Sequence, residues 1–200
     1  MEEKNLILAV DIGTTETKAV LVSPDGYIDS CRCGCSLSYP AKSCVEQSPE
    51  EIAEAIYSTS RKTLADHPDL VSRLAGVVFT SQMQNTIPVD REGKPLMNML
   101  SWMDERAAEF TQKEMYKGLV KIEGYPVTKL IKFLRITGGM PGKNGKDTVC
   151  KLAWMKKTKP DLYDSVHKFL DVKDYAVFLA TGNYVSSYDM ANITWLMDTR

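Results

Sequence analysis

The first third of the chain alternates short apolar runs with polar turns, a pattern typical of consecutive β-strands. One apolar run fills residues 6–10, and a second extends over residues 18–22. A turn signal, Pro-Asp-Gly at 24–26, precedes residues 27–35, which can return as a third antiparallel strand. The pattern therefore predicts a three-stranded meander at the N-terminal end.

A helix and a further strand are expected after this meander. Ser48 is suited to be an N-cap, because a proline stands at the first helical position and a glutamate three residues after the cap. Apolar residues at helical spacing then predict an amphipathic helix over residues 49–66. Residues 76–81 are expected to form a buried strand parallel to the first. Together these elements predict an α/β fold with a mixed sheet flanked by helices.

The second half of the chain is more helical. We expect helices over residues 104–117 and 148–158, the latter capped by Thr148. A third helix over residues 172–181 is expected to stop at Gly182. Two short apolar runs near the C-terminal end are expected to be strands, residues 184–188 and 193–197. The glycine-rich residues 138–146 lack the spacing of a P-loop, so we interpret them as a flexible surface loop.

Charge and cysteine content narrow the range of partners and compartments. The 25 basic and 26 acidic side chains leave a net charge of −1, which does not suggest a nucleic-acid or membrane partner. No stretch approaches the roughly 20 apolar residues of a membrane span, and the charged start is unlike a signal peptide. Five cysteines, an odd number, indicate a reducing cytoplasm. Cys31, Cys33 and Cys35 share one strand face and are interpreted as structural thiols.

The most informative chemistry lies between the first two strands. Asp11 stands at the carboxyl end of the first strand, where it can hold Mg²⁺ directly or through water. Gly13 lets the backbone approach an anion, while Thr14, Thr15 and Lys18 add hydrogen-bond donors. The alternative is an ordinary β-hairpin with a polar turn. The turn resembles the first phosphate loop of the actin-like ATPase superfamily, which includes sugar kinases, hexokinases and Hsp70-type chaperones.

Three later segments narrow this resemblance. Residues 81–96 begin Ser-Gln-Met-Gln at the end of the fourth expected strand, residues 101–108 read Ser-Trp-Met-Asp-Glu-Arg-Ala-Ala, and residues 148–155 read Thr-Val-Cys-Lys-Leu-Ala-Trp-Met. In this order the segments resemble the N-terminal domain of the FGGY family of carbohydrate kinases, in a xylulokinase-like form. The resemblance covers residues 1–200 and implies a ribonuclease-H-like domain, with ATP and Mg²⁺ as cofactors. It also implies that the ATP-binding C-terminal domain and the general base lie beyond Arg200, so that these 200 residues alone are inactive.

The resemblance assigns acceptor recognition to Gln82, Met83, Gln84, Trp102 and Asp104. Recognition of a sugar or polyol needs hydrogen-bonding groups that converge on several hydroxyls, and a flat apolar wall for the carbon face. Gln84 offers a donor and an acceptor, Asp104 an acceptor, and Trp102 the wall. Alternatively, Trp102 is a core aromatic, Asp104 caps the following helix and Gln84 caps its strand end. Gln84 departs from the residues typical of xylulokinases and glycerol kinases, so the sequence does not identify the acceptor.

Two further parts of the family pattern are only partly present. The Lys-Leu-x-Trp segment departs from the family signature at both ends, so we interpret Lys151, Leu152 and Trp154 as packing and helix-end residues. Near Asp189 the family usually has an acidic turn beside the sugar cleft, but its second acidic position is Met190 here. Two other functions stay open, namely a stand-alone sugar-binding or regulatory module without catalysis and a chaperone-like ATPase. A homodimer is also left open.

Overall fold

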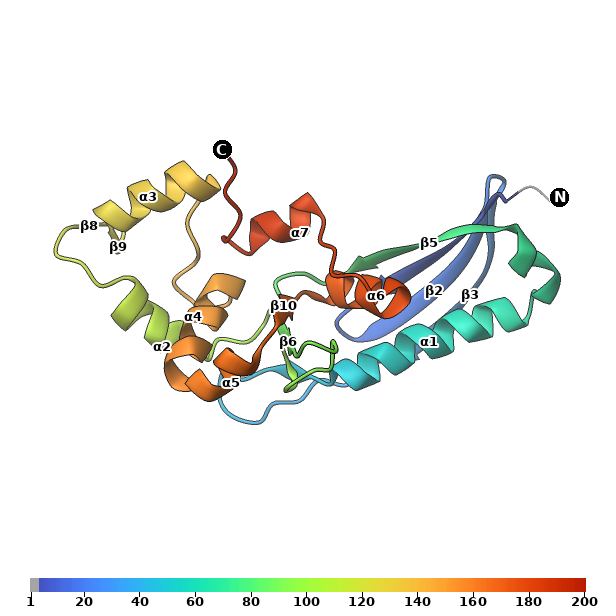
Figure 1. Ribbon diagram of the computed structural model, residues 1–200, viewed down its shortest axis with the longest axis horizontal. Coiled ribbons are helices and arrows are strands. Elements are labelled where there is room, and N and C mark those ends of the chain that lie inside the picture. Colours follow the sequence, from blue (N-terminus) through green and yellow to red (C-terminus); the bar gives the residue numbers. More distant parts are fainter. Residues whose placement is uncertain (1–3) are drawn as a thin grey trace.

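A four-stranded mixed sheet forms one end of the elongated molecule, and a helical lobe forms the other (Figure 1). The computed structural model describes residues 4–200. The sheet strands are β1 (Leu6–Ile12), β2 (Glu16–Ser23), β3 (Gly26–Gly34) and β5 (Leu74–Ser81). Their order is β3-β2-β1-β5, with β1 antiparallel to β2, β2 antiparallel to β3, and β1 parallel to β5. The predicted meander and the parallel direction of the predicted strand are therefore confirmed. The prediction that this strand is buried is wrong, because β5 is an edge strand and none of its residues is buried.

Helix α1 (Pro49–Ala65) begins where the local signals indicate. The Ser48 hydroxyl accepts a hydrogen bond from the backbone N–H of Glu51 at 3.1 Å, and Pro49 occupies the first helical position. Ile52 and Ile56 lie on the buried side of the helix. The short 3-10 turn Pro68–Arg73 then leads into β5.

One face of the sheet holds the main hydrophobic core. Leu8, Val10 and Ile12 alternate along β1 toward α1 and toward α6 (Val172–Thr181), which lies against the same core. Gly182 ends α6 in a left-handed conformation with φ 70°, as predicted. Asp11 lies between these core positions, so it points to the opposite face and is exposed. The alternation that builds the core thus also presents Asp11 to solvent.

The β6–β10 pair lies between the sheet and the helical lobe, whereas the β8–β9 pair lies within the lobe, at its end far from the sheet (Figure 1). β4 pairs with β7, β6 with β10, and β8 with β9, all antiparallel. The short strands are β4 (Glu46–Gln47), β6 (Ile87–Val89), β7 (Met99–Leu100), β8 (Lys121–Ile122), β9 (Tyr125–Pro126) and β10 (Lys168–Leu170). The helices are α2 (Ala108–Phe110), α3 (Val127–Thr137), α4 (Thr148–Thr158), α5 (Pro160–Ser165) and α7 (Tyr188–Ile193).

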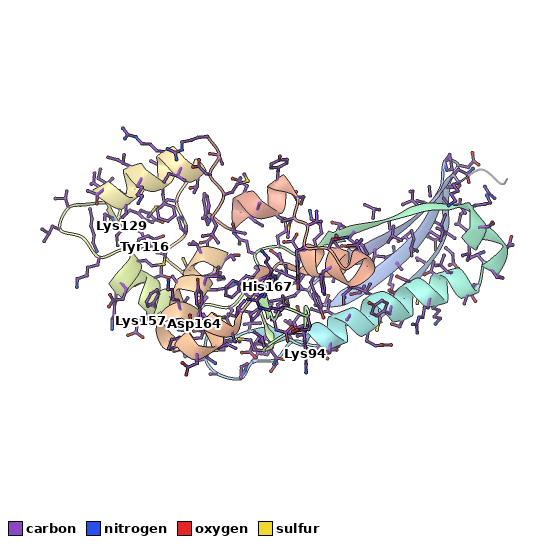
Figure 2. All side chains as sticks on the ribbon, in the orientation of Figure 1. Lys94, Tyr116, Lys129, Lys157, Asp164 and His167 are labelled. Carbon is purple, nitrogen blue, oxygen red and sulfur yellow. The ribbon has the colours of Figure 1, made fainter. Side chains whose placement is uncertain are left out.

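Packing inside this lobe centres on Tyr116, whose hydroxyl donates to the carbonyl oxygen of Pro141 at 2.6 Å (Figure 2). The five cysteines are free thiols, with Cys150 buried and the others half-buried. Burial raises the pKa of Cys150 to about 11, which keeps this thiol protonated. Within residues 4–200, no helix combines the length and apolar character needed to cross a membrane.

The prediction of one helix over residues 104–117 is wrong. The segment forms only α2, followed by a π-helical turn, Thr111–Met115. The Asp104 carboxylate accepts a hydrogen bond from the backbone N–H of Arg106 at 3.0 Å, and this local turn delays the start of the helix.

The two C-terminal strands were also predicted wrongly. Helix α7 begins at Tyr188, and residues 194–197 belong to no strand. Residues 184–187 and 194–197 lie in neither strand nor helix, and α7 forms between them with Met190 buried. Runs of five residues are too short for periodicity to identify a strand.

Two local predictions around α4 also need correction. Thr148 is the first residue of α4 rather than its cap, and Asp147 occupies the cap position. Residues 138–146 are only partly at the surface, because a Cβ at Gly145 would lie 2.4 Å from the backbone nitrogen of Ala108. Close packing against the start of α2 therefore holds this loop.

Asp171 connects α6 to the loop after β5. It caps α6, and its carboxylate accepts hydrogen bonds from the Asn85 side-chain amide at 3.1 Å and the Asn85 backbone N–H at 3.2 Å. Burial raises the pKa of Asp171 to about 6, although these hydrogen bonds oppose the rise. The folded state therefore binds this proton more tightly than the unfolded state does.

We expect this difference to appear in the pH dependence of stability. The folded pKa lies above the ordinary value, so Asp171 contributes to the free energy of unfolding below about pH 4. This contribution, up to about 3 kcal/mol, is lost as the pH rises through about 6. Urea unfolding from pH 4 to pH 7 should show this loss in the wild-type protein and a flatter curve for Asp171→Asn. The exposed Asp164 (Figure 2) provides the control Asp164→Asn, which should keep the wild-type slope. Equal slopes for wild type and Asp171→Asn would contradict the prediction.

Candidate functional site

The site forms where β1 and β5 end beside each other. These neighbouring parallel strands pair Asp11 with Thr80 and Ile12 with Ser81. The backbone N–H of Gln82 continues the ladder by donating to the carbonyl oxygen of Ile12 at 2.9 Å. The turn at residues 13–15 and the segment 82–84 therefore leave the same edge of the sheet.

These segments line a cleft of about 510 Å³. Its walls are Thr14, Gln82, Met83, Gln84, Trp102 and Ile193. The structure thus brings together four of the five residues predicted to read the acceptor and one residue of the predicted phosphate turn. Ile193 joins them from α7 and was not predicted.

A chain of hydrogen bonds fixes the phosphate turn against the acceptor residues. The Trp102 indole N–H donates to the Thr14 hydroxyl at 3.1 Å, and this hydroxyl donates to Gln82 Oε1 at 3.1 Å. Gln82 Nε2 donates to Gln47 Oε1 at 2.8 Å, and Gln47 Nε2 returns to the Thr14 carbonyl oxygen at 2.9 Å. Trp102 is 39% exposed, so it is a cleft residue and not a core aromatic.

Gln47 is the member of this network that sequence reasoning missed. It is buried at the end of β4, immediately before the N-cap of α1. Its partners in this network lie 33 and 35 residues away, and its Nε2 also donates to the Ser36 carbonyl oxygen 11 residues away, so no local pattern marks it. A polar residue inside an extended segment that precedes a helix cap was the available signal.

Gln84 has an unusual backbone and a fixed side chain. Its φ is 64°, in the left-handed region that few residues other than glycine adopt. Its side-chain Nε2 donates to Asp147 Oδ1 at 3.2 Å. The alternative role of Gln84 as a simple strand-end cap does not account for this contact with the start of α4.

Of the residues predicted to bind metal and phosphate, only Thr14 lines the cleft, and the others lie near Thr14 in sequence without lining the cleft. Asp11 is exposed, and its register partner on β2 is Lys18, which is half-buried. The backbone N–H of Gly13 donates to the Glu16 carbonyl oxygen at 2.9 Å, and a Cβ at Gly13 would lie only 3.0 Å from that oxygen. Thr15 is exposed at the tip of the turn. The short distance between position 13 and the Glu16 carbonyl oxygen accounts for glycine at residue 13.

The donor set at Asp11 fits Mg²⁺. Among residues 4–200 no cluster of three or more His, Cys, Asp or Glu side chains could form a metal cage. Mg²⁺ usually keeps several waters and takes one or two carboxylates together with phosphate oxygens. A single exposed carboxylate beside the turn predicted to bind phosphate suits that preference.

Asp104 does not reach the cleft. It is fully buried and accepts hydrogen bonds from the backbone N–H of Val45 at 2.7 Å and from the Arg106 guanidinium at 2.9 Å. Arg106 also pairs with Glu46 at 2.7 Å. Although burial lowers the pKa of Arg106, its hydrogen bonds with these carboxylates produce a net rise. The predicted sugar contact of Asp104 is therefore not supported. The alternative that Asp104 caps the following helix is also wrong, because the N-cap of α2 is Ala107, whose side chain forms no hydrogen bond. Asp104 instead holds the turn to Arg106 against Val45.

Comparisons with known proteins agree with this arrangement. Residues 6–200 match the model of the FGGY family of carbohydrate kinases, N-terminal domain. The gluconokinase of Bacillus subtilis (strain 168) is 29% identical over 199 residues, which cover 97% of this chain and 35% of that protein.

Solved structures give the same result. A "xyloylose kinase" from Brucella ovis superposes with a TM-score of 0.84 at 25% identity, covering 97% of this chain and 37% of that one. A gluconate kinase from Lactobacillus acidophilus superposes with a TM-score of 0.80 at 25% identity, covering 96% and 36%. The chain therefore spans a little over a third of the length of these relatives. On the match over residues 6–200, the chain belongs to the FGGY family of carbohydrate kinases and corresponds to its N-terminal domain.

Proposed function

We propose that this chain is the acceptor-binding domain of an ATP-dependent carbohydrate kinase, which transfers the γ-phosphate of ATP to a hydroxyl of a sugar or polyol. The observation that carries the proposal is the cleft that Thr14 of the predicted phosphate turn shares with Gln82, Met83, Gln84 and Trp102. Phosphoryl transfer depends mainly on positioning and charge neutralisation. A cleft that holds both the phosphate turn and acceptor-reading groups meets the first requirement.

Each group of residues has a distinct role in this proposal. Bound ATP with Mg²⁺ supplies the transferable phosphoryl group and most of the charge neutralisation. Asp11 would hold the metal, and the turn from Gly13 to Thr15, with Lys18, would bind phosphate oxygens. Gln82 and Gln84 would hydrogen-bond the acceptor hydroxyls, while Met83 and Trp102 cover its apolar faces.

The six side chains that line the cleft include no carboxylate or imidazole. The proposal therefore assigns the general base to a residue outside this set. It leaves the acceptor at the level of a sugar, sugar acid or polyol, since the relatives include enzymes named gluconokinase and xylulose kinase.

The function can be tested by measuring ADP production by the full-length gene product with pentuloses, hexuloses, polyols and sugar acids. Acceptor-dependent ADP production with one of these classes is expected. Saturable sugar binding without ADP production would instead support a stand-alone sugar-binding module. Neither binding nor turnover with any class would contradict both functions.

Asp11→Asn should lower turnover of the full-length protein by several orders of magnitude and leave its thermal unfolding unchanged. The substitution removes the charge that a metal–phosphate pair requires but preserves the shape of an exposed residue. Asp25→Asn, in the exposed turn between β2 and β3, is the matched control and should behave as wild type. Near-normal turnover of Asp11→Asn would contradict a role of Asp11 in metal binding.

Gln84→Ala should raise the KM for the acceptor about tenfold or more, because loss of a buried hydrogen-bond partner costs roughly 1–3 kcal/mol. The KM for ATP should change little. Gln112→Ala removes an exposed amide from the helical lobe and should alter neither constant. Equal effects of Gln84→Ala on both substrates, or none on either, would exclude a specific role in acceptor binding.

A further inference from the structure

Two residues of α4 reach Gln84 from behind the cleft. Asp147 occupies the N-cap position of α4, and Lys151 lies one turn further along the same helix. Asp147 Oδ1 accepts from the Gln84 side chain at 3.2 Å, while Lys151 Nζ donates to the Gln84 carbonyl oxygen at 2.8 Å. The helix thus holds both the side chain and the main chain of one cleft residue.

Lys151 also holds the second acceptor-reading segment. Its Nζ donates to the carbonyl oxygen of Ser101 at 2.7 Å, and Ser101 directly precedes Trp102. One amino group therefore connects the loop after β5 to the loop after β7. These are the loops that carry Gln84 and Trp102 into the cleft.

Burial of the charged Lys151 amino group carries a desolvation cost that an apolar residue at this position would avoid. Its side chain is 0% exposed, and in the part of the chain that the structure describes no carboxylate oxygen lies within 4.0 Å of its nitrogen. Burial lowers its pKa to about 8, although three aspartates at longer range oppose this change. An apolar side chain of similar length would fill the same space without the desolvation cost. The two carbonyl contacts are what the amino group adds.

The contacts with α4 also determine what Gln84 presents to the cleft. A left-handed backbone is strained for a residue other than glycine, and the bond from Lys151 helps to hold that conformation. Gln84 Nε2 donates to Asp147. The other end of the same amide, Oε1, is therefore left to accept a hydrogen bond. Among residues 4–200 no group donates to Oε1. The amide is therefore oriented to accept a hydrogen bond from a ligand hydroxyl.

We propose that Lys151 and Asp147 are positioning residues for acceptor recognition: Lys151 sets the relative position of the Gln84 and Trp102 loops, and Asp147 sets which end of the Gln84 amide faces the acceptor. This role rests on the proposed function and replaces our sequence interpretation of Lys151 as a packing residue. Substitution of either residue is therefore expected to weaken acceptor binding more than ATP binding.

The test compares Lys151→Met with Lys157→Met in the full-length protein. Lys157 lies on the same helix but is exposed on the outside of the lobe (Figure 2). Lys151→Met should raise the KM for the acceptor about tenfold and leave the KM for ATP within about twofold, while Lys157→Met should match wild type. A parallel rise in both constants, or no change in either, would overturn the proposal.

Hydrogen exchange provides a readout that does not need activity. In Lys151→Met, exchange should accelerate at least about fivefold in peptides covering residues 82–86 and 100–104, with β1–β3 unchanged. Acceleration throughout the sheet would indicate a general loss of stability and would contradict a positioning role, as would no acceleration in either peptide. If wild-type protein produces no ADP with any acceptor, the proposed function fails, and the exchange result still decides whether Lys151 connects the two loops.

Asp147→Asn tests the contact between Asp147 and the Gln84 side chain with little change in side-chain shape. Asp147 Oδ2 accepts from the Gly142 backbone N–H at 2.7 Å, and Oδ1 accepts from the Trp195 indole N–H at 2.9 Å as well as from Gln84. An asparagine that keeps its oxygen on Gly142 presents its own amide N–H to Gln84 and gives up the Trp195 bond. This arrangement favours reversal of the Gln84 amide and exposure of a donor to the cleft. The KM for the acceptor should rise as in Lys151→Met, with the KM for ATP unchanged. Retention of wild-type values for both would contradict the role of Asp147. This variant also keeps the proposal testable if Lys151→Met does not fold.

Discussion

The parallel pairing of β1 with β5 is the constraint on which the rest of the structure depends. Because the two strands run in the same direction in adjacent positions, the turn after β1 and the segment after β5 must leave the same edge of the sheet. The bond from Gln82 to Ile12 extends this pairing into the loops. The turn predicted to bind phosphate and the segment predicted to read the acceptor thus meet, although 68 residues separate Thr14 from Gln82.

Loops placed side by side still need fixed positions, and here hydrogen bonds between polar side chains at the cleft wall provide them. The chain of hydrogen bonds through Trp102, Thr14, Gln82 and Gln47 lies at the cleft wall, while α4 supports Gln84 from behind. A shift of either loop would break these hydrogen bonds, so the network favours one arrangement. This rigidity is what a phosphoryl-transfer site requires, since its catalytic effect comes largely from positioning.

The parts of the fold predicted from sequence are those with short-range causes. The Ser48 cap, the end of α6 at Gly182 and the alternation in β1 are local signals, and each is confirmed. The segments predicted wrongly, before α2 and around α7, are controlled by the Asp104–Arg106 turn and by burial of Met190. The residues of the site also fall into those that local motifs identify and those that depend on distant contacts. The cleft residues were found through family motifs, but Gln47 and Asp147 act on partners 33 to 63 residues away and leave no local pattern.

The central claim is that the acceptor binds in the cleft between the turn after β1 and the loop after β5. NMR titration of the protein with the acceptor that supports the fastest turnover tests this claim most directly. The account predicts saturable shifts of the Gln84 side-chain amide, the Trp102 indole N–H and the Thr14 backbone amide. Shifts confined to the groove of about 380 Å³ beside α3, lined by residues such as Phe133 and Leu196, would contradict it.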